Sequence, residues 1–196
     1  MTPQAESILD LFRATGAFLS GHFRLTSGLH SPAYLQCALV LQHPRHAADL
    51  GAMLAAELRR LAPEPIGLVA SPALGGVIAG YEVARALGAR FIFTERDADG
   101  KMALRRGFGV SPGQAAFVVE DVITTGGSTR EVVDVLRVAG ARPVAAGSIV
   151  DRSGGHADVG VPRVALLTLE VTAYDPAACP LCAQGLPVVK PGSRRA

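Results

Sequence analysis

The chain has 196 residues, of which 49% are hydrophobic and 18% are charged, and its formal net charge is +2. This composition is that of a globular protein with room for one domain and a sizeable core, and it excludes a disordered chain. A net charge so near zero argues against a surface that coats nucleic acid, and no apolar run approaches the roughly 20 residues that span a bilayer.

The first part of the chain predicts a helix, short strands and a second helix. Residues 5–18 have the apolar spacing of an amphipathic helix that ends at Gly16. They lack the basic start of a signal peptide, so we expect a cytoplasmic protein with neither a membrane nor a nucleic acid as partner. Residues 22–42 predict short strands around a Ser-Gly turn, and residues 46–61 predict an amphipathic helix. We interpret residues from about 1 to 40 as a small hood.

From Ile66 onward, short and almost continuously apolar runs alternate with helical patterns. Buried strands of a parallel sheet have this composition, and the alternation is that of βαβ units. We therefore predict an α/β fold with an open sheet, in a single domain that spans residues 1–196 with the hood and a C-terminal tail. The predicted strands cover residues 66–70, 89–93, 115–119, 143–150 and 163–169, with helices at 76–88 and 128–140. Ligands of such sheets bind beyond the carboxyl ends of the strands, so the loops that follow these strands are the candidate sites.

The loop after residue 119 carries two acids and a turn rich in glycine and hydroxyl groups. Glu120 and Asp121 close the apolar run, and "TTGGST" (residues 124–129) begins the next helix. We predict that Ser128 and Glu131 cap this helix reciprocally. Free N–H groups at a helix N-terminus, adjacent glycines and four hydroxyl side chains favour a phosphate. On spacing alone, a plain strand–helix turn is the alternative.

The two carboxylates favour a ligand over a plain turn. They repel a phosphate, but they accept hydrogen bonds from vicinal hydroxyls or bind Mg²⁺ through oxygen. A ligand with a phosphate at one end and a diol nearby is a ribose 5-phosphate, and two acids would support positive charge on its ring in an oxocarbenium-like transition state. The chain lacks a Gly-Lys-Ser/Thr phosphate loop and a G-x-G-x-x-G after its first parallel strand, which weakens nucleotide hydrolysis and dinucleotide redox chemistry as alternatives.

The segment "VVEDVITTGGST" (residues 118–129) resembles the phosphoribosyl pyrophosphate signature of the type I phosphoribosyltransferases. Further segments resemble, in the same order, the branch of this family that acts on orotate. They are similar to its hood (residues 21–36), its pyrophosphate loop (71–80), its mobile catalytic loop (93–108), its base-binding strand end (148–155) and the tail of one bacterial subgroup (179–194). The resemblance implies the type I phosphoribosyltransferase fold, an open and mostly parallel sheet flanked by helices, with a small N-terminal hood. It also implies Mg²⁺-dependent transfer of ribose 5-phosphate from phosphoribosyl pyrophosphate (PRPP) to orotate, in pyrimidine nucleotide synthesis.

The resemblance assigns roles by position. Glu120 and Asp121 would hold the ribose diol, and the turn that follows would hold the 5′-phosphate. Arg152, with Thr124, would contact orotate, whose carboxylate suits a planar guanidinium; a surface ion pair of Arg152 with Asp151 is the alternative. A cis peptide would join Ala73 to Leu74. Mg²⁺ would be held mainly by the substrate, with no metal site made by side chains. The implied substrate-binding residues are Ala73, Leu74, Gly75, Glu120, Asp121, Val122, Ile123, Thr124, Thr125, Gly126, Gly127, Ser128 and Arg152.

A polar excursion at residues 95–107 interrupts the apolar strands and predicts either a lid or a plain exposed hairpin. A ligand rich in phosphate favours a lid that brings cations to the leaving pyrophosphate. Arg96 is carried over from the family, and Lys101, after a glycine at the expected tip, is the residue we expect to reach the leaving group. Arg105 and Arg106 are its alternatives. In the family this loop closes over the neighbouring subunit's site, which implies a homodimer.

Several points stay open at this stage. Thr26 stands where many relatives have a lysine, which leaves the contribution of the hood to catalysis in doubt. A phosphoribosyltransferase for a purine, or a non-catalytic regulator that senses PRPP, are alternatives to the orotate enzyme. Cys179 and Cys182 form a Cys-x-x-Cys motif. Three interpretations are open: the two cysteines pack structurally, they form half of a metal site with His156 as an extra ligand, or they carry out redox chemistry.

Overall fold

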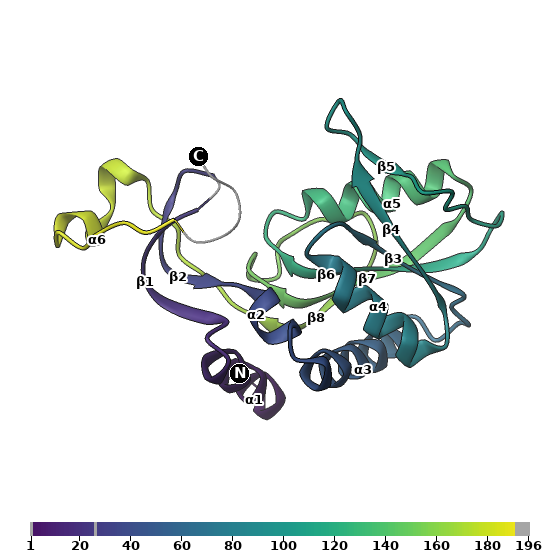
Figure 1. Cartoon of the computed structure of the whole chain (residues 1–196), viewed down its shortest axis with the longest axis horizontal. Coiled ribbons are helices and arrows are strands. Elements are labelled where there is room, and N and C mark those ends of the chain that lie inside the picture. Colours follow the sequence, from purple (N-terminus) through teal and green to yellow (C-terminus); the bar gives the residue numbers. More distant parts are fainter. Residues whose placement is uncertain (1, 26, 191–196) are drawn as a thin grey trace. The chain divides into compact units, whose positions relative to one another are not determined.

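The computed structural model describes residues 2–25 and 27–190, so Thr26 and the last six residues of the tail lie outside the described part of the chain. The chain divides into two compact units, one made of Met1–Val40 with Glu170–Ala196 and one of Leu41–Leu169 (Figure 1). The helices and strands are α1 (Pro3–Ala14), β1 (Phe18–Arg24), β2 (His30–Leu35), α2 (Cys37–Leu41), α3 (Pro44–Leu61), β3 (Leu68–Pro72), α4 (Gly76–Leu87), β4 (Arg90–Arg96), β5 (Met102–Leu104), β6 (Ala115–Ile123), α5 (Gly127–Val138), β7 (Arg142–Asp151), β8 (Arg163–Thr168), the 3₁₀ helix η1 (Pro176–Ala178) and α6 (Pro180–Ala183). Within the described residues, no helix combines the length and the apolar character needed to cross a membrane.

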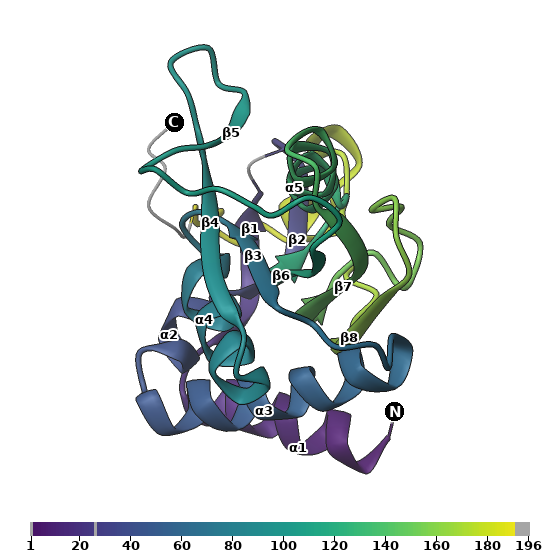
Figure 2. The same ribbon diagram turned by 90° about the vertical axis from the view of Figure 1, so that its right-hand side faces the viewer.

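The larger unit is built on a six-stranded sheet with the strand order β5-β4-β3-β6-β7-β8. All neighbouring strands are parallel except β4 and β5, which form an antiparallel hairpin. Helices α3 and α4 cover one face of the sheet and α5 covers the other (Figure 2). This arrangement confirms the predicted α/β fold with an open, mostly parallel sheet flanked by helices.

The central strands are buried because the helices cover both faces, and their sequences are correspondingly apolar. Every residue of β3 is buried. On β6, the side chains of Phe117, Val118 and Val119 are fully buried. Helix α4 ends at Gly88, whose left-handed backbone (φ 68°) favours glycine. The predicted alternation of apolar runs and amphipathic helices therefore matches the observed elements.

The chain reverses its direction of travel across the sheet between β3 and β6. From β3 it passes through α4 to β4, toward one edge, whereas from β6 it passes through α5 to β7, toward the other edge. The carboxyl ends of β3 and β6 thus meet at a topological switch point, which is the usual ligand site of an open α/β sheet. Both loops that the sequence analysis selected for phosphate binding begin there.

Two predicted elements differ from the structure. Residues 37–41 form the short helix α2 rather than a strand, because burying Cys37, Val40 and Leu41 on one side requires helical spacing. Strand β6 also continues to Ile123, four residues beyond the apolar run that predicted it. The two acids therefore belong to the strand and not to the loop after it.

The smaller unit contains α1, the β1–β2 hairpin and the C-terminal segment from Glu170 onward. Helix α1 buries Ile8, Leu9 and Phe12. Backbone pairing joins the C-terminal segment to the hairpin at two places, Phe23 with Val189 and His30 with Tyr174. That the whole chain forms a single domain, with a hood of residues 1–40 and a C-terminal tail, stays a prediction.

Candidate active site

The acidic pair lies near the carboxyl end of β6, at the switch point. Glu120 is half-buried, and the hydroxyl of the fully buried Thr129 donates a hydrogen bond to its Oε2. Burial raises the pKa of Glu120 to about 7; the hydrogen bond from Thr129 opposes this shift, and the neighbouring Asp121 adds to it. Burial also raises the pKa of Asp121, although backbone N–H groups lower it in part. The protein thus holds two carboxyl groups that would gain from a cation or from hydroxyl donors beside them.

The loop after β3 packs against this pair. The peptide between Ala73 and Leu74 is cis, as the resemblance implies, and the Ala73 N–H donates to the Thr94 carbonyl at 2.8 Å. Gly75 lies so close to the acidic strand that a Cβ there would be 2.7 Å from Asp121 Oδ1. With the Asp121 carboxylate in this position only glycine fits here, so the structure brings the predicted pyrophosphate loop and the predicted ribose-binding acid together.

The turn after β6 carries the residues predicted to bind the phosphate. Thr124, Thr125 and Gly127 are exposed and Ser128 is half-buried, while Gly126 is buried with φ 82°. A Cβ at Gly126 would be 2.9 Å from Val159 Cγ1, so the backbone needs glycine here for its conformation and for space. The turn leads directly into the N-terminus of α5, whose N–H groups and dipole favour an anion.

The predicted capping box at this helix is wrong. Helix α5 begins at Gly127, its N-cap is Gly126, and no side chain caps it. Because Ser128 already lies inside the first turn, its hydroxyl cannot occupy the cap position. Glu131 instead binds Arg96, with 2.7 Å between Arg96 Nη2 and Glu131 Oε2.

The neighbouring carboxyl ends of β6 and β7 bring the backbone of Arg152 next to that of Ile123. The Arg152 N–H donates to the Ile123 carbonyl at 2.8 Å. Asp151 is fully buried and accepts hydrogen bonds from the Ser153 N–H (2.7 Å) and from Arg163. Asp151 is therefore not a surface carboxylate and has Arg163 as an ion-pair partner, while the contact of Arg152 with orotate stays a prediction. Burial alone would raise the pKa of Asp151, but the hydrogen bonds from Ser153 and Arg163 outweigh it and hold that pKa below its usual range.

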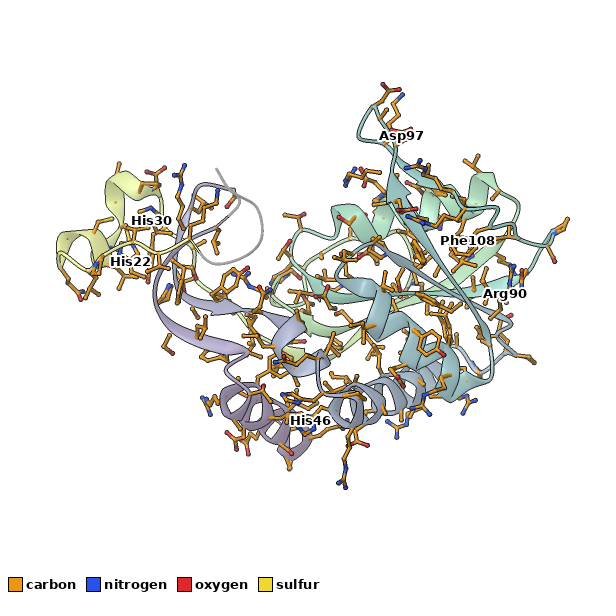
Figure 3. All side chains as sticks on the ribbon, in the orientation of Figure 1. His22, His30, His46, Arg90, Asp97 and Phe108 are labelled. Atoms are coloured by element: carbon orange, nitrogen blue, oxygen red, sulfur yellow. The ribbon has the colours of Figure 1, made fainter. Side chains whose placement is uncertain are left out.

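The polar excursion at residues 95–107 forms a hairpin in which Arg96 of β4 pairs with Met102 of β5. The hairpin extends away from the rest of the sheet, and Asp97 is labelled near its tip in Figure 3. Arg106 is held at its base by two hydrogen bonds to Glu95, at 2.6 and 2.8 Å, and its guanidinium lies over the Phe93 ring. Arg106 is thus engaged in an ion pair at the base of the hairpin, and its role as an alternative to Lys101 stays a prediction.

Lys101 lies at the end of the hairpin turn. Its backbone N–H donates to Asp97 Oδ1 at 2.9 Å, and its side chain is exposed. Among the described residues, no acidic group forms an ion pair with Lys101, whereas Arg96 is bound to Glu131 and to the Gly100 carbonyl. Lys101 is therefore available to a ligand, and Arg96 links the hairpin to α5.

The partners that orient the site do not follow from the sequence. Thr129 is one of the four hydroxyls predicted to favour a phosphate, but its hydroxyl faces Glu120. Arg163, which holds Asp151, is not among the predicted site residues. For Thr129 the signal was its position in the first turn of the helix, on the side facing the strand; Arg163 is 12 residues from its partner in sequence and carried no comparable signal.

The chain is similar to known phosphoribosyltransferases. A family model described as "Phosphoribosyl transferase domain" matches residues 39–164. The curated orotate phosphoribosyltransferase of Pelotomaculum thermopropionicum is 56% identical over 190 residues, which cover 97% of this chain and 98% of that protein.

Solved structures give the same result. The crystal structure of orotate phosphoribosyltransferase from Aeropyrum pernix superposes with a TM-score of 0.66 and 27% identity, over 83% of this chain and 94% of that one. The Mycobacterium tuberculosis orotate phosphoribosyltransferase in complex with PRPP superposes with a TM-score of 0.63 and 26% identity, over 85% of this chain and 97% of that one.

Proposed function

The chain belongs to the phosphoribosyl transferase family, among its orotate phosphoribosyltransferases, and from this premise we propose how its residues bind the substrates and perform the transfer. Ribose 5-phosphate passes from PRPP to orotate, which yields orotidine 5′-phosphate and pyrophosphate. The enzyme is a pentosyltransferase of pyrimidine nucleotide synthesis. One observation carries the assignment of residues: Asp121 lies against Gly75 of the loop after β3, Glu120 accepts a hydrogen bond from Thr129 at the start of α5, and the glycine-rich turn follows both acids along the chain.

We place the ribose ring beside Glu120 and Asp121, with its vicinal hydroxyls donating to the two carboxylates. The 5′-phosphate lies in the turn of residues 122–128, against backbone N–H groups and hydroxyl side chains. The diphosphate extends toward the loop of residues 73–75. This orientation is supported by charge, because it keeps both phosphate ends away from the acids and the neutral diol next to them.

The base is held at the end of β7. The Arg152 guanidinium is a planar, bidentate partner for the orotate carboxylate. Thr124, which follows the neighbouring strand β6, supplies a hydroxyl. A neutral purine has no carboxylate to offer Arg152, so this contact favours orotate.

The acidic pair acts mainly on the transition state. As the bond to pyrophosphate breaks, positive charge builds on the ribose ring, and half-buried carboxylates stabilise that charge more than they stabilise the neutral sugar. Orotate then attacks the anomeric carbon from the position that Arg152 sets. No covalent intermediate with the enzyme is needed.

Magnesium fits this donor set, because carboxylate oxygens are the ligands that Mg²⁺ prefers and the pair is only half-buried. Mg²⁺ would be held mainly by the substrate, and Glu120 and Asp121 would be the protein's oxygen donors beside it. When bound, it neutralises negative charge on the pyrophosphate leaving group.

The β4–β5 hairpin acts as the lid. Lys101 supplies a cation to the departing pyrophosphate, and Arg96 positions the hairpin through its ion pair with Glu131. The chain works as a homodimer in which the hairpin of one subunit covers the site of the other. Support for this arrangement comes from the exposed tip, which leaves Lys101 available to a partner.

Turnover with several bases tests the function. The purified protein is mixed with Mg²⁺, PRPP and orotate, adenine or hypoxanthine, and loss of the base's ultraviolet band is followed. We expect turnover with orotate alone. Turnover with a purine would instead indicate a purine enzyme, and none with any base would indicate a protein that only senses PRPP.

A further inference from the structure

Four metal-binding side chains meet in the smaller unit, outside the site described above. His22 lies on β1 and His30 begins β2, while Cys179 and Cys182 come from the C-terminal segment. Their ligand atoms all lie within 4.8 Å of one another. Figure 3 shows the two histidines close together beside the C-terminal segment. His156, the extra ligand considered from the sequence, is not in this group.

The distances within the group are close to the edges of a zinc tetrahedron, with the two nitrogens nearer to each other than such an edge. Bond lengths of about 2.0–2.1 Å to nitrogen and about 2.3 Å to sulfur place two nitrogens about 3.3 Å apart, and a nitrogen about 3.5 Å from a sulfur. Here His22 Nε2 lies 2.9 Å from His30 Nδ1. Cys179 Sγ and Cys182 Sγ lie 3.5 and 3.7 Å from His22 Nε2, and Cys182 Sγ lies 3.3 Å from His30 Nδ1. A single ion could contact all four atoms with little movement.

The surroundings orient the ligands as metal sites usually do. His22 Nδ1 lies 2.8 Å from the Leu186 carbonyl, which accepts its proton and leaves Nε2 with a lone pair facing the group. Backbone hydrogen bonds fix both histidines against the C-terminal segment: the His22 carbonyl accepts from Val189, and His30 exchanges two bonds with Tyr174. His22, His30 and Cys179 are buried, so three of the four ligands are shielded from water.

The C-terminal segment has little else to hold its side chains. Between residues 170 and 190, Cys179 is the one buried residue. Leu186, Val188 and Val189 are 43%, 44% and 52% exposed, so apolar burial contributes little. A small unit without a sizeable core commonly relies on a metal or a disulfide. The four ligands join residues from opposite ends of the chain, where a cross-link constrains the most.

We propose that His22, His30, Cys179 and Cys182 bind one Zn²⁺ in a structural Cys₂His₂ site that ties the C-terminal segment to the β1–β2 hairpin. The mixed nitrogen and sulfur set in tetrahedral spacing selects zinc over the oxygen-preferring magnesium of the active site. All four positions are filled by the protein, so the site is structural and takes no part in the transfer reaction.

Metal content of the full chain tests the site. The protein is produced without a histidine tag, passed over a weak chelating resin and analysed for metals by mass spectrometry. We expect about one zinc per chain in the wild type and less than about a tenth of that in Cys182→Ser and His30→Ala. Matched controls remove a thiol or an imidazole outside the group: Cys37→Ala and His156→Ala should keep the full zinc content.

Cobalt reports on the ligands directly. Replacing zinc by Co²⁺ should give the intense visible bands of a tetrahedral site together with sulfur-to-cobalt charge transfer in the wild type and in Cys37→Ala. If the ligand variants fail to fold, the wild-type zinc content and this spectrum still decide. Metal-free, folded wild type with Cys179 and Cys182 joined in a disulfide would overturn the proposal, as would zinc retained by soluble Cys182→Ser and His30→Ala.

Discussion

Two opposing effects act on the pKa of Glu120. Burial raises its pKa to about 7, although the Thr129 hydroxyl favours its ionised form. In the unfolded chain the same group titrates at its ordinary, lower pKa. Between these two pKa values the folded protein binds more protons than the unfolded chain, so stability falls as the pH rises through this window.

We expect Glu120→Gln to remove that loss. The wild type should lose about 1–3 kcal/mol of unfolding free energy through this group as the pH rises from about 5 to about 8, and the variant should not. Urea unfolding followed by circular dichroism at the two pH values measures the difference. Asp151 titrates in both proteins and cancels in the comparison, whereas Asp121 interacts with Glu120 and belongs to the difference. Identical pH profiles would contradict the assignment.

Arg152 is the residue on which the choice of base depends. In Arg152→Ala we expect the KM for orotate to rise about 10- to 100-fold, because a charge-assisted bidentate contact is lost, while the KM for PRPP changes by less than about threefold. Initial rates with each substrate varied in turn separate the two effects. Arg130→Ala, which removes a cation from an exposed ion pair with Asp158, is the matched control and should leave both values unchanged. Equal weakening of both substrates in Arg152→Ala would move Arg152 out of the base pocket.

At the scale of single residues, the sequence was sufficient to predict site residues whose chemistry is evident from their type and their order in the chain. Acids that close an apolar run, followed by glycines and hydroxyls, predicted the site of Glu120 and Asp121. Side-chain direction was not predictable: the Thr129 hydroxyl faces an acid because α5 begins at Gly127, and that start depends on the buried glycine before it.

The β4–β5 hairpin extends away from the rest of the sheet, and it carries Lys101. We expect Lys101→Ala to lower kcat by about 100-fold or more while orotate binding stays nearly unchanged, because the missing cation acts on the leaving group. Steady-state rates and isothermal titration with orotate separate the two quantities. Lys190→Ala, the other lysine of the chain, should behave as the wild type. An unchanged kcat in Lys101→Ala would transfer the role to Arg105 or Arg106.

Helices and strands were predicted where the apolar residues of a segment follow one clear pattern, either a continuous run or a helical spacing. The buried strands and the helices α3, α4 and α5 follow from apolar runs and amphipathic spacing. Helix α2 was missed because five residues are too few to distinguish a helical from a strand period. The end of β6 was misplaced because its last residues pair with β7, which keeps two acids in the strand against their propensity.

At the scale of the whole molecule, a lid shared between subunits makes a mixing experiment decisive. Lys101→Ala and Asp121→Asn should each be nearly inactive alone. If one subunit's hairpin covers the other's site, random re-pairing makes half of the dimers mixed, each with one intact site, and about a quarter of the wild-type activity returns. Assay after mild denaturation and joint refolding measures it. No recovery above the separate variants would mean that each hairpin serves its own site or that the chains do not pair.

Contacts between distant parts of the chain were beyond sequence reasoning. Cys182 lies 152 positions after His30, so nothing local to either residue indicated that they meet. The approach of Gly75 to Asp121 is of the same kind: both were expected at the site, but only the switch point of the sheet explains why they touch.

That contact couples two positions for anyone who redesigns the enzyme. A library that varies position 75 while keeping the acid at 121 should favour glycine, since any Cβ there requires the Asp121 carboxylate to move. Enlarging the pocket for a bulkier sugar or leaving group therefore requires paired changes, and related enzymes that lack a glycine here should also show a shorter or displaced partner on the facing strand.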